Sequence, residues 1–522
     1  MSKAKRFLSV TVAIMMAMQI LMLTGCGSTA NKQPEKSNTP TTVATQAPVE
    51  NEVEAPTEPV TLKMLGQTEK NFDPMADITR TRINEMMNYD IQGEMYADTE
   101  KILMALTSGE EYDIIKIAKG KKELISQLIK NKLVQPLDES IEKYGPNLKE
   151  AFTEEVWNMG SSDGKKYAIF NTNYERVIEG IAIRQDWLDK LNMEVPTTIE
   201  EFYLMLKAFK EQDPGGVGSE NVIPLTFNYE EYGTLNLNGL AQAFDIGSGL
   251  QSYIEQDGKL VLSMELPGAT EYVAFLKKLY SEGLLDADFL SNKWSNFDQK
   301  IGSGNVGSAI MSCWYPGGQQ AVMALGENSK FVYIETLKSK TGTQRIEKTG
   351  GMESAILVPY TSKKVDDVVK FANDFLDDKN YKTLVIGDEG VHYSNDNDKL
   401  MPILPAFNDL NLARWFFPSN EGKRYTEIFQ VRANKVPEMG SMYDDVGAKN
   451  DKYGYVSPTA FAPSLEAVIT NEKALSEMTK EMIIQIILDD KVDMSQFDVF
   501  VKDYKASGGD AITKAYNDVL VK

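Results

Sequence analysis

The side chains able to perform nucleophilic or acid–base chemistry are few among the 522 residues of this chain. It contains one histidine, His392, and two cysteines, Cys26 and Cys313. A Ser-His-Asp or Cys-His triad would need His392 as its base, and most zinc sites need more nitrogen and sulfur ligands than this. Enzymatic interpretations are therefore confined to carboxylate chemistry, such as glycoside hydrolysis. The 76 acidic residues make carboxylate pairs inevitable, so such pairs alone indicate nothing.

Cys26 closes the sequence Leu-Thr-Gly-Cys at the end of an uncharged run, residues 7–23, that follows three basic residues. This order is typical of an export signal. A thiol directly after Leu-Thr-Gly resembles the bacterial lipobox, which implies a signal peptide over residues 1–25, a diacylglycerol on the Cys26 sulfur and an exported protein tethered to a membrane. The alternatives are a signal peptide with an incidental cysteine, or a membrane span near the lower limit of about 17 to 25 residues.

Residues 26–59 would then link the lipid to a folded body. Thr, Pro, Ala, Asn and Glu dominate this segment, and almost nothing in it is apolar. Such a composition cannot bury enough surface to offset the entropy of ordering, so we expect a disordered tether. Two acyl chains would anchor it stably, whereas one would bind only marginally.

The body, from about residue 60 to 522, is long enough for two domains. The net charge is -21, and it becomes -24 when residues 1–25, with three positive charges and no negative one, are removed. A strongly acidic body disfavours nucleic acid and anionic lipid as partners. With Cys26 committed to lipid, Cys313 has no disulfide partner. We expect a monomer without metal or cofactor.

Strands and helices alternate along the body, which predicts α/β layers with a largely parallel sheet. Strands are expected at 60–65, 112–117 and 181–184. Thr198 and Glu201 form a capping-box pattern, after which Phe202, Met205, Leu206 and Phe209 recur at helical spacing. Similar stripes predict helices around residues 272–279 and 368–375.

The order of these landmarks is similar to that of the extracellular solute-binding proteins, family 1, of ATP-driven importers, and closest to large lipoprotein members linked to oligosaccharide uptake. The resemblance covers the whole body. It is carried by ALTSGEEYDIIKI (105–117), LVQPLDESIEKYGPNL (133–148), DGKKYAIF (163–170), IAIRQDWLDKLNMEVPTTIEEFYLMLKAFKEQDP (181–214), LKKLYSEGLLDADF (276–289), IGSGNVGSAI (301–310) and GDEGVHYS (387–394).

The resemblance implies a periplasmic-binding-protein-like fold of two α/β lobes, joined by hinge strands, that close on a ligand in the cleft between them. Ligands of open α/β sheets bind beyond the carboxyl ends of the strands, and two facing lobes can bury a polar solute. We expect one lobe at 60–172 plus 350–405 and the other at 173–349 plus 406–522.

A saccharide site needs aromatic rings for the apolar sugar faces and polar side chains for the hydroxyls. Several candidates follow predicted strands or flank glycine turns. The candidate ligand-binding residues are Trp314, Tyr315, Tyr229, Tyr232, Asn71, Phe72, Asp73, Tyr393 and Trp415. Trp314 could instead be a core residue, and Trp415 could pack between lobes. Trp187 is expected in the core and His392 in a structural role. Arg176, Arg184 and Lys293 could serve a uronate, or could be surface charges.

Two motifs are set aside on their context. Residues 302–307 match G-x-G-x-x-G but follow a helical stretch and precede a strand, which is the wrong order for dinucleotide binding. Residues 213–225 sit where relatives carry a calcium-type loop. Gly215 and Val217 stand where that loop needs side-chain oxygens, so we expect a metal-free turn.

The sequence therefore predicts a lipid-anchored receptor on the outer face of the cytoplasmic membrane. It would bind a saccharide between its lobes and deliver it to an ABC-type permease without catalysing a reaction. The alternatives are a receptor for a peptide or another small solute and, less favoured, an exported glycosidase that uses paired carboxylates.

Overall fold

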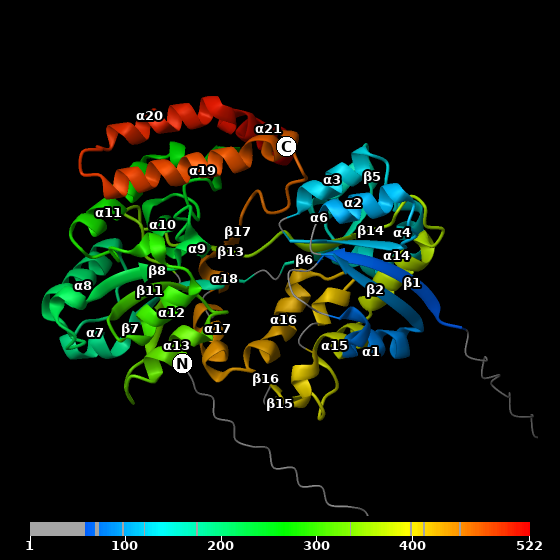
Figure 1. Cartoon of the computed structure of the whole chain (residues 1–522), viewed down its shortest axis with the longest axis horizontal. Coiled ribbons are helices and arrows are strands. Elements are labelled where there is room, and N and C mark those ends of the chain that lie inside the picture. Colours follow the sequence, from blue (N-terminus) through cyan, green and yellow to red (C-terminus); the bar gives the residue numbers. More distant parts are fainter. Residues whose placement is uncertain are drawn as a thin grey trace, which may run out of the picture. The chain divides into compact units, whose positions relative to one another are not determined.

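Two β-sheets with helices around them organise the part of the chain that the computed structural model describes (Figure 1). The described residues are 58–67, 73–96, 99–119, 121–173, 176–334, 336–396, 399–410, 413–447 and 450–521. The predicted signal peptide, Cys26, nearly all of the tether, Asn71 and Phe72 lie outside them. Among the described helices, none has the length and apolar character needed to cross a membrane.

The first sheet has five strands in the order β2-β1-β3-β14-β6. They are β1 (Val60–Gln67), β2 (Tyr89–Tyr96), β3 (Ile114–Ala118), β6 (Ala168–Thr172) and β14 (Met352–Leu357). β1 runs parallel to β2 and β3, whereas β14 is antiparallel to β3 and β6. Consequently β1, β2, β3 and β6 all end at one edge of the sheet, and β14 begins at that edge.

Helices from distant parts of the sequence pack around this sheet. They include α1 (Ile78–Met87), α2 (Thr99–Ser108), α3 (Lys122–Lys130), α4 (Asp138–Tyr144), α5 (Pro146–Ala151), α6 (Glu154–Asn158), α14 (Val365–Phe375) and α15 (Asp378–Ile386). α14 packs against α4 and α5, and α1 packs against α15. The stripe predicted for 368–375 is confirmed, because Val368, Phe371, Ala372 and Phe375 are all buried.

The second sheet has four strands in the order β12-β7-β11-β8. They are β7 (Glu179–Arg184), β8 (Ile223–Phe227), β11 (Val306–Ser312) and β12 (Phe331–Ile334). β11 is parallel to β8, and β7 is antiparallel to both β11 and β12. The sheets are thus mixed, because one strand in each runs against the others, and the predicted largely parallel arrangement holds for the remaining strands. The reversed strands are β7 and β14, which the chain enters as it crosses from the other sheet.

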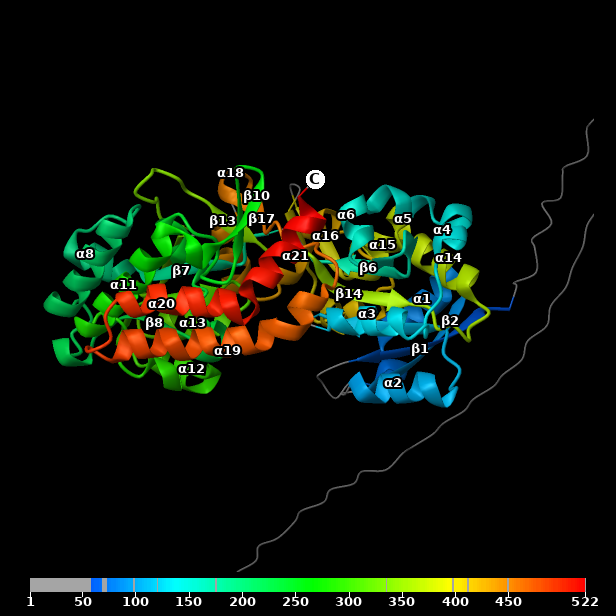
Figure 2. The ribbon, with the colours of Figure 1, turned by 90° about the horizontal axis from the view of Figure 1, so that it is seen from above.

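Helices α8 (Ile199–Gln212) and α11 (Pro267–Ser281) belong to the second sheet's core. α8 begins at the predicted capping box, with the Thr198 hydroxyl accepting from the Glu201 backbone N–H, and its predicted stripe is buried. α11 packs on α19 (Glu466–Leu488), which also contacts α20 (Ser495–Tyr504) and α21 (Asp510–Leu520) (Figure 2). A π-helical turn, η8 (Lys505–Gly509), joins α20 to α21.

Trp187 is fully buried, as predicted, and its ring meets that of Phe209 edge-on, with centroids 5.2 Å apart. The G-x-G-x-x-G match lies between α12 (Trp294–Gly302) and β11, which confirms its predicted context. Gly307 is needed for packing, because a Cβ there would stand 2.8 Å from the Trp187 ring. Gly307 therefore serves the core.

The chain crosses between the sheets over residues 173–178 and 335–351, and these two segments hydrogen-bond to each other. Asn173 N donates to the Gly351 carbonyl at 2.8 Å, and Thr349 N donates to the Arg176 carbonyl at 3.0 Å. Each segment leaves one sheet where β6 or β12 ends and enters the other where β7 or β14 begins. The carboxyl edges of both sheets are therefore tied together at this crossing.

Further contacts bear on the predicted lobe boundaries, which remain a prediction. α16 (Gly422–Ala433) packs on α15 and on β16 (Lys399–Pro402), whereas α17 (Pro437–Gly447) packs on β12 and α13 (Pro316–Met323). Because α16 contacts elements of the first sheet, we propose that residues 406–433 belong to the first lobe and that the second lobe resumes near residue 434.

Two glycines near the carboxyl edge of the first sheet make room for Trp415. A Cβ on Gly66 would stand 2.8 Å from the indole Cζ2, and one on Gly93 would stand 2.9 Å from Cζ3. The Trp415 carbonyl also accepts a hydrogen bond from Lys116 Nζ on β3 at 2.5 Å. These contacts seat the Trp415 indole directly on β1 and β2.

Gly66→Ala should therefore lower the free energy of unfolding by about 1 to 3 kcal/mol, because overpacking forces a rigid ring to move. Denaturant unfolding followed by tryptophan fluorescence measures the effect. Gly302→Ala is the matched control, since the nearest atom to its added Cβ is 3.9 Å away. Equal stability of Gly66→Ala and the wild type would contradict the packing described.

Candidate functional site

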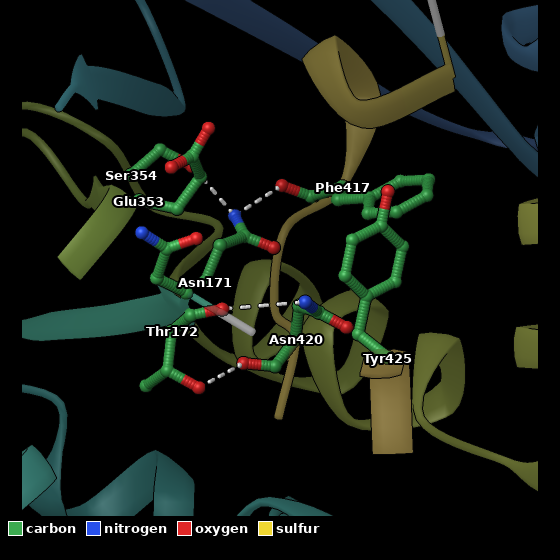
Figure 3. Close-up of a pocket in the computed structure, with 8 residues that line it drawn as sticks. Asn171, Thr172, Glu353, Ser354, Phe417, Asn420 and Tyr425 are labelled. Carbon is green, nitrogen blue, oxygen red and sulfur yellow. Dashed lines mark hydrogen bonds between the residues drawn. The ribbon is translucent and has the colours of Figure 1, made fainter. Parts of the chain in front are cut away.

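Amide side chains gather where β6 ends and β14 begins (Figure 3). Asn171 Nδ2 donates to Ser354 Oγ and to the Phe417 carbonyl, both at 2.8 Å. Asn420 extends the sheet edge, because Thr172 N donates to its carbonyl at 2.9 Å and its own N–H donates to the Phe170 carbonyl at 3.1 Å. Strand pairing therefore fixes the backbone that carries these amides.

The space enclosed by these residues and by Glu353 and Tyr425 is small, with a volume of about 20 Å³. That is room for roughly one water molecule, so a solute must bind beside this space and not within it. The Oδ1 atoms of Asn171 and Asn173 are buried and accept no hydrogen bond from the residues that the structure describes. They are acceptors that a hydroxyl-bearing solute or a water could satisfy.

An aromatic row begins at Trp314 and runs toward these amides. The Trp314 ring lies 5.0 Å from Phe429 on α16 and 5.5 Å from Tyr443 on α17, and Phe429 lies 5.0 Å from Tyr425. Trp314 is partly buried and comes from the carboxyl end of β11. The row thus connects the second sheet with helices that lie beyond the crossing segments.

Arg176 adds a positive charge to this row. Its guanidinium carbon lies 3.6 Å from the Tyr443 ring centroid, and its Nη2 donates to the Tyr443 carbonyl at 2.6 Å. Such stacking is characteristic of arginine and holds the guanidinium plane in place. Arg176 lies on the first crossing segment, so its position depends on the relation between the two sheets.

Cys313 precedes Trp314 in the sequence and holds the end of β11 in place. The thiol is fully buried, and burial raises its pKa to about 12, so it stays a protonated, unreactive thiol at neutral pH. Cys313 N donates to the Ile178 carbonyl at 2.7 Å, which ties the end of β11 to the first crossing segment.

Rings, amide oxygens, a guanidinium and the Glu353 carboxylate are the groups that bind a neutral or acidic polyol. Among the described residues, no group of three or more His, Cys, Asp or Glu could hold a metal ion. His392 serves a turn, with its Nδ1 accepting from Asp388 N at 3.0 Å. The arrangement is therefore suited to binding.

The other sequence-predicted residues lie elsewhere. Tyr315 packs on Trp294 and Phe297 and donates to Asp298. Tyr229 lines an open pocket with Lys293 and Lys480 at the end of β8. Asp73 is exposed and caps a short helix through Met75 N at 2.9 Å.

Burial separates two of the predicted tyrosines from any ligand surface. Tyr232 is 6% exposed in the core of the second sheet, and Tyr393 is 3% exposed at the start of β15 (Tyr393–Asp396). Both side chains serve packing, so we no longer propose them as ligand contacts. Arg184, also buried, is committed to Asp186 at 2.7 Å and is not free for a uronate.

The 213–225 loop closes on itself. Both carboxylate oxygens of Asp213 accept from backbone amides, Val217 N at 2.9 Å and Gly218 N at 2.7 Å. These bonds hold the turn, to which Gly215 and Val217 add no side-chain oxygen.

Sequence reasoning missed most of the amide and aromatic groups in the row. Asn171 lies in β6 and Asn173 directly follows it, but no strand was predicted there, so their position gave no signal. Asn420, Phe429 and Tyr443 gave none, because only the packing of α16 and α17 brings them to the ends of β6 and β11.

A family model, that of the bacterial extracellular solute-binding proteins, matches residues 88–382. The chain is 23% identical to the polygalacturonan/rhamnogalacturonan-binding protein YtcQ of Bacillus subtilis, over 86% of this chain and 89% of that protein. It is 25% identical to the fructooligosaccharide ABC transporter substrate-binding protein FusA of Streptococcus pneumoniae, over 54% of this chain and 53% of that protein.

Solved structures confirm the predicted two-lobed α/β fold. The alginate-binding protein AlgQ2, without calcium ion, superposes with a TM-score of 0.66 at 19% identity, over 89% of this chain and 98% of that one. FusA of S. pneumoniae in complex with kestose gives a TM-score of 0.63 at 19% identity, over 88% and 98% of the two chains. At such identities the likeness concerns the fold alone.

The bond between Asn420 and Tyr381 offers a test of how the amide cluster is held. The Tyr381 hydroxyl is buried and donates to Asn420 Oδ1. Asn420→Ala leaves this donor without its acceptor, so the free energy of unfolding should fall by about 1 to 3 kcal/mol. Tyr381→Phe removes the hydroxyl but keeps the ring that Arg424 covers at 4.2 Å.

A double-mutant cycle by denaturant unfolding measures the coupling between the two residues. The double variant should lose less stability than the sum of the single variants, by about 1 kcal/mol. Strict additivity would show that the bond does not stabilise the cluster.

Proposed function

Because the chain belongs to the bacterial extracellular solute-binding protein family, we propose that it is a receptor that binds a saccharide and delivers it to the permease of an ABC-type importer. The observation that carries this proposal is the partly exposed Trp314 ring, backed by the buried rings of Phe429 and Tyr425, together with the amide oxygens of Asn171 and Asn173. Binding, rather than turnover of the solute, is the proposed activity.

The chemistry of the row suits a sugar on two counts. Aromatic faces attract the apolar C–H faces of a pyranose or furanose, and amide oxygens accept from its hydroxyls. Arg176 would additionally favour a carboxylate-bearing sugar. A relative named for polygalacturonan and rhamnogalacturonan, and another named for fructooligosaccharides, support a panel that includes both uronates and neutral oligomers.

The crossing segments explain how binding would be reported to a permease. A solute that touches residues on both sides of the crossing favours the arrangement that offers the most contacts, and it shifts the population by its difference in affinity. Trp314 follows β11 of the second sheet and Asn171 lies in β6 of the first. Phe429 and Tyr425 connect the two regions, so Trp314 and Asn171 are placed to sense the same solute.

The purified full chain should bind at least one member of a panel of neutral oligosaccharides and oligouronates in titration calorimetry. At about a hundred times its Kd, that sugar should add about 2.7 kcal/mol to stability. Trp314→Ala should weaken binding at least ten-fold, because a stacking ring is lost. Tyr360→Ala is the matched control, an exposed aromatic outside the row.

Trp314→Phe tests whether a loss of binding in Trp314→Ala comes from a folding defect. It keeps a ring at the site and should retain part of the affinity. Binding of short peptides but of no sugar would overturn the saccharide assignment in favour of a peptide receptor. Chromatographic recovery of the sugar after incubation separates a receptor from a glycosidase, because consumption of the sugar would contradict the receptor proposal.

We also propose that Cys26 carries the lipid that holds the receptor on the outer face of the bacterial membrane. The Leu-Thr-Gly-Cys sequence and the composition of residues 27–59 support this, as does 25% identity to lipoprotein LipO of B. subtilis over 81% of this chain.

Cys26→Ser should move the protein from the membrane fraction to the medium in a Gram-positive host, because the sulfur that accepts the diacylglycerol is gone. Cell fractionation with immunoblotting measures this. Cys313→Ser, which removes the other thiol, is the control and should leave the protein in the membrane fraction. Membrane retention of Cys26→Ser would contradict the lipid anchor.

A further inference from the structure

A second cavity, of about 340 Å³, lies between the C-terminal helices and the strands of the second lobe. Its walls come from α19, α20 and α21, from β9 (Tyr253–Gln256) and from β13 (Ile346–Lys348), which pairs with β17 (Gly454–Val456). Figure 2 shows α21 next to β10 (Lys259–Leu262), where Leu260 N donates to Asn517 Oδ1 at 2.9 Å. The cavity shares no lining residue with the amide cluster.

The cavity carries negative charge without compensation. Glu347 and Glu472 line it, and no lysine or arginine does. Neither carboxylate forms an ion pair with a basic residue of the described chain, and burial raises the pKa of both. The charge of Glu123 raises the pKa of Glu472 further, whereas Ser248 and Tyr455 hydroxyls partly stabilise the ionised Glu347.

Three tyrosines accompany these carboxylates. Tyr253 and Tyr516 meet edge to face, with ring centroids 5.0 Å apart, and Tyr504 lines the same cavity. Two of their hydroxyls are already engaged, since Tyr253 shares a hydrogen bond with Thr513 Oγ1 at 3.0 Å and Tyr504 accepts from Gln251 Nε2 at 3.4 Å. The rings are therefore fixed, as a preformed site requires.

Carboxylates among aromatic rings are the groups that recognise an organic ammonium ion. The carboxylates supply a counter-charge, and the negative faces of the rings attract a cation, by about 2 kcal/mol when it is desolvated. The Asn236 side chain also lines the cavity, and its buried Oδ1 accepts no hydrogen bond from described residues.

We infer that this cavity is a second binding site, for a small organic ammonium compound, that operates independently of the saccharide site. A bound cation would neutralise the pair of glutamates that the described residues leave without a counter-ion. The cavity volume exceeds that of a choline-sized molecule, so such a ligand enters without displacing a helix.

Titration calorimetry with the purified full chain tests the inference. The probes are choline, ethanolamine, and 3,3-dimethylbutan-1-ol, which has the shape of choline but no charge. At least one of the two ammonium probes should bind, and the neutral alcohol should bind at least ten-fold more weakly than choline. Absence of binding by both ammonium probes, or equal binding of choline and the alcohol, would overturn the inference.

Glu347→Gln and Glu472→Gln test whether the ammonium probe binds in this cavity. Each should weaken binding of the ammonium probe at least ten-fold, whereas Glu466→Gln, at an acid of α19 that does not line the cavity, should not. Thermal unfolding checks that each variant is folded, and two variants ensure that one failure to fold leaves the test intact. If Glu347→Gln and Glu472→Gln are both folded and both keep the wild-type affinity, the proposed site is wrong.

Trp314→Ala separates this inference from the proposed function. That variant should lose the saccharide and keep the ammonium probe, because Trp314 does not line the second cavity. Loss of both ligands in folded Trp314→Ala would contradict the independence of the two sites.

Discussion

The crossing of the chain between its two sheets is the constraint on which the rest of the structure depends. Since Asn173 N bonds to the Gly351 carbonyl and Thr349 N to the Arg176 carbonyl, the two crossing segments run side by side. Strands entered from a crossing must run against their neighbours, which is why β7 and β14 are antiparallel within otherwise parallel groups. The carboxyl edges of both sheets are thereby brought to one place.

Side-chain packing then brings further residues to the carboxyl edges of the two sheets. Trp314, at the end of β11, reaches Phe429 and Tyr443, which follow it in the sequence by more than a hundred residues. Arg176 stacks on Tyr443 from the first crossing segment itself. One row of rings thus touches both sides of the crossing, so any movement of one sheet against the other would alter the surface that a solute meets.

Local patterns were enough to predict the parts of the fold that local physics decides. The capping box at Thr198, the buried stripes of α8 and α14 and the core position of Trp187 follow from helical spacing and side-chain size. The direction of β14 could not be predicted from local patterns, because it depends on the sheet from which the chain arrives. Tyr232 and Tyr393 illustrate the same limit, since proximity to a strand end does not tell exposed rings from buried ones.

Charge distinguishes the two binding regions of this acidic protein. At the crossing, Arg176 stacks on Tyr443 and Lys119 lies 3.8 Å from the Glu353 carboxylate, so amides and rings remain the dominant groups, which suits solutes of little or negative charge. In the cavity beneath α19, Glu347 and Glu472 stand among tyrosines without an opposing cation in the described chain. Because like charge excludes a ligand as effectively as opposite charge attracts it, an anionic sugar that suits the first region is rejected by the second. The two regions can therefore select different solutes without competing.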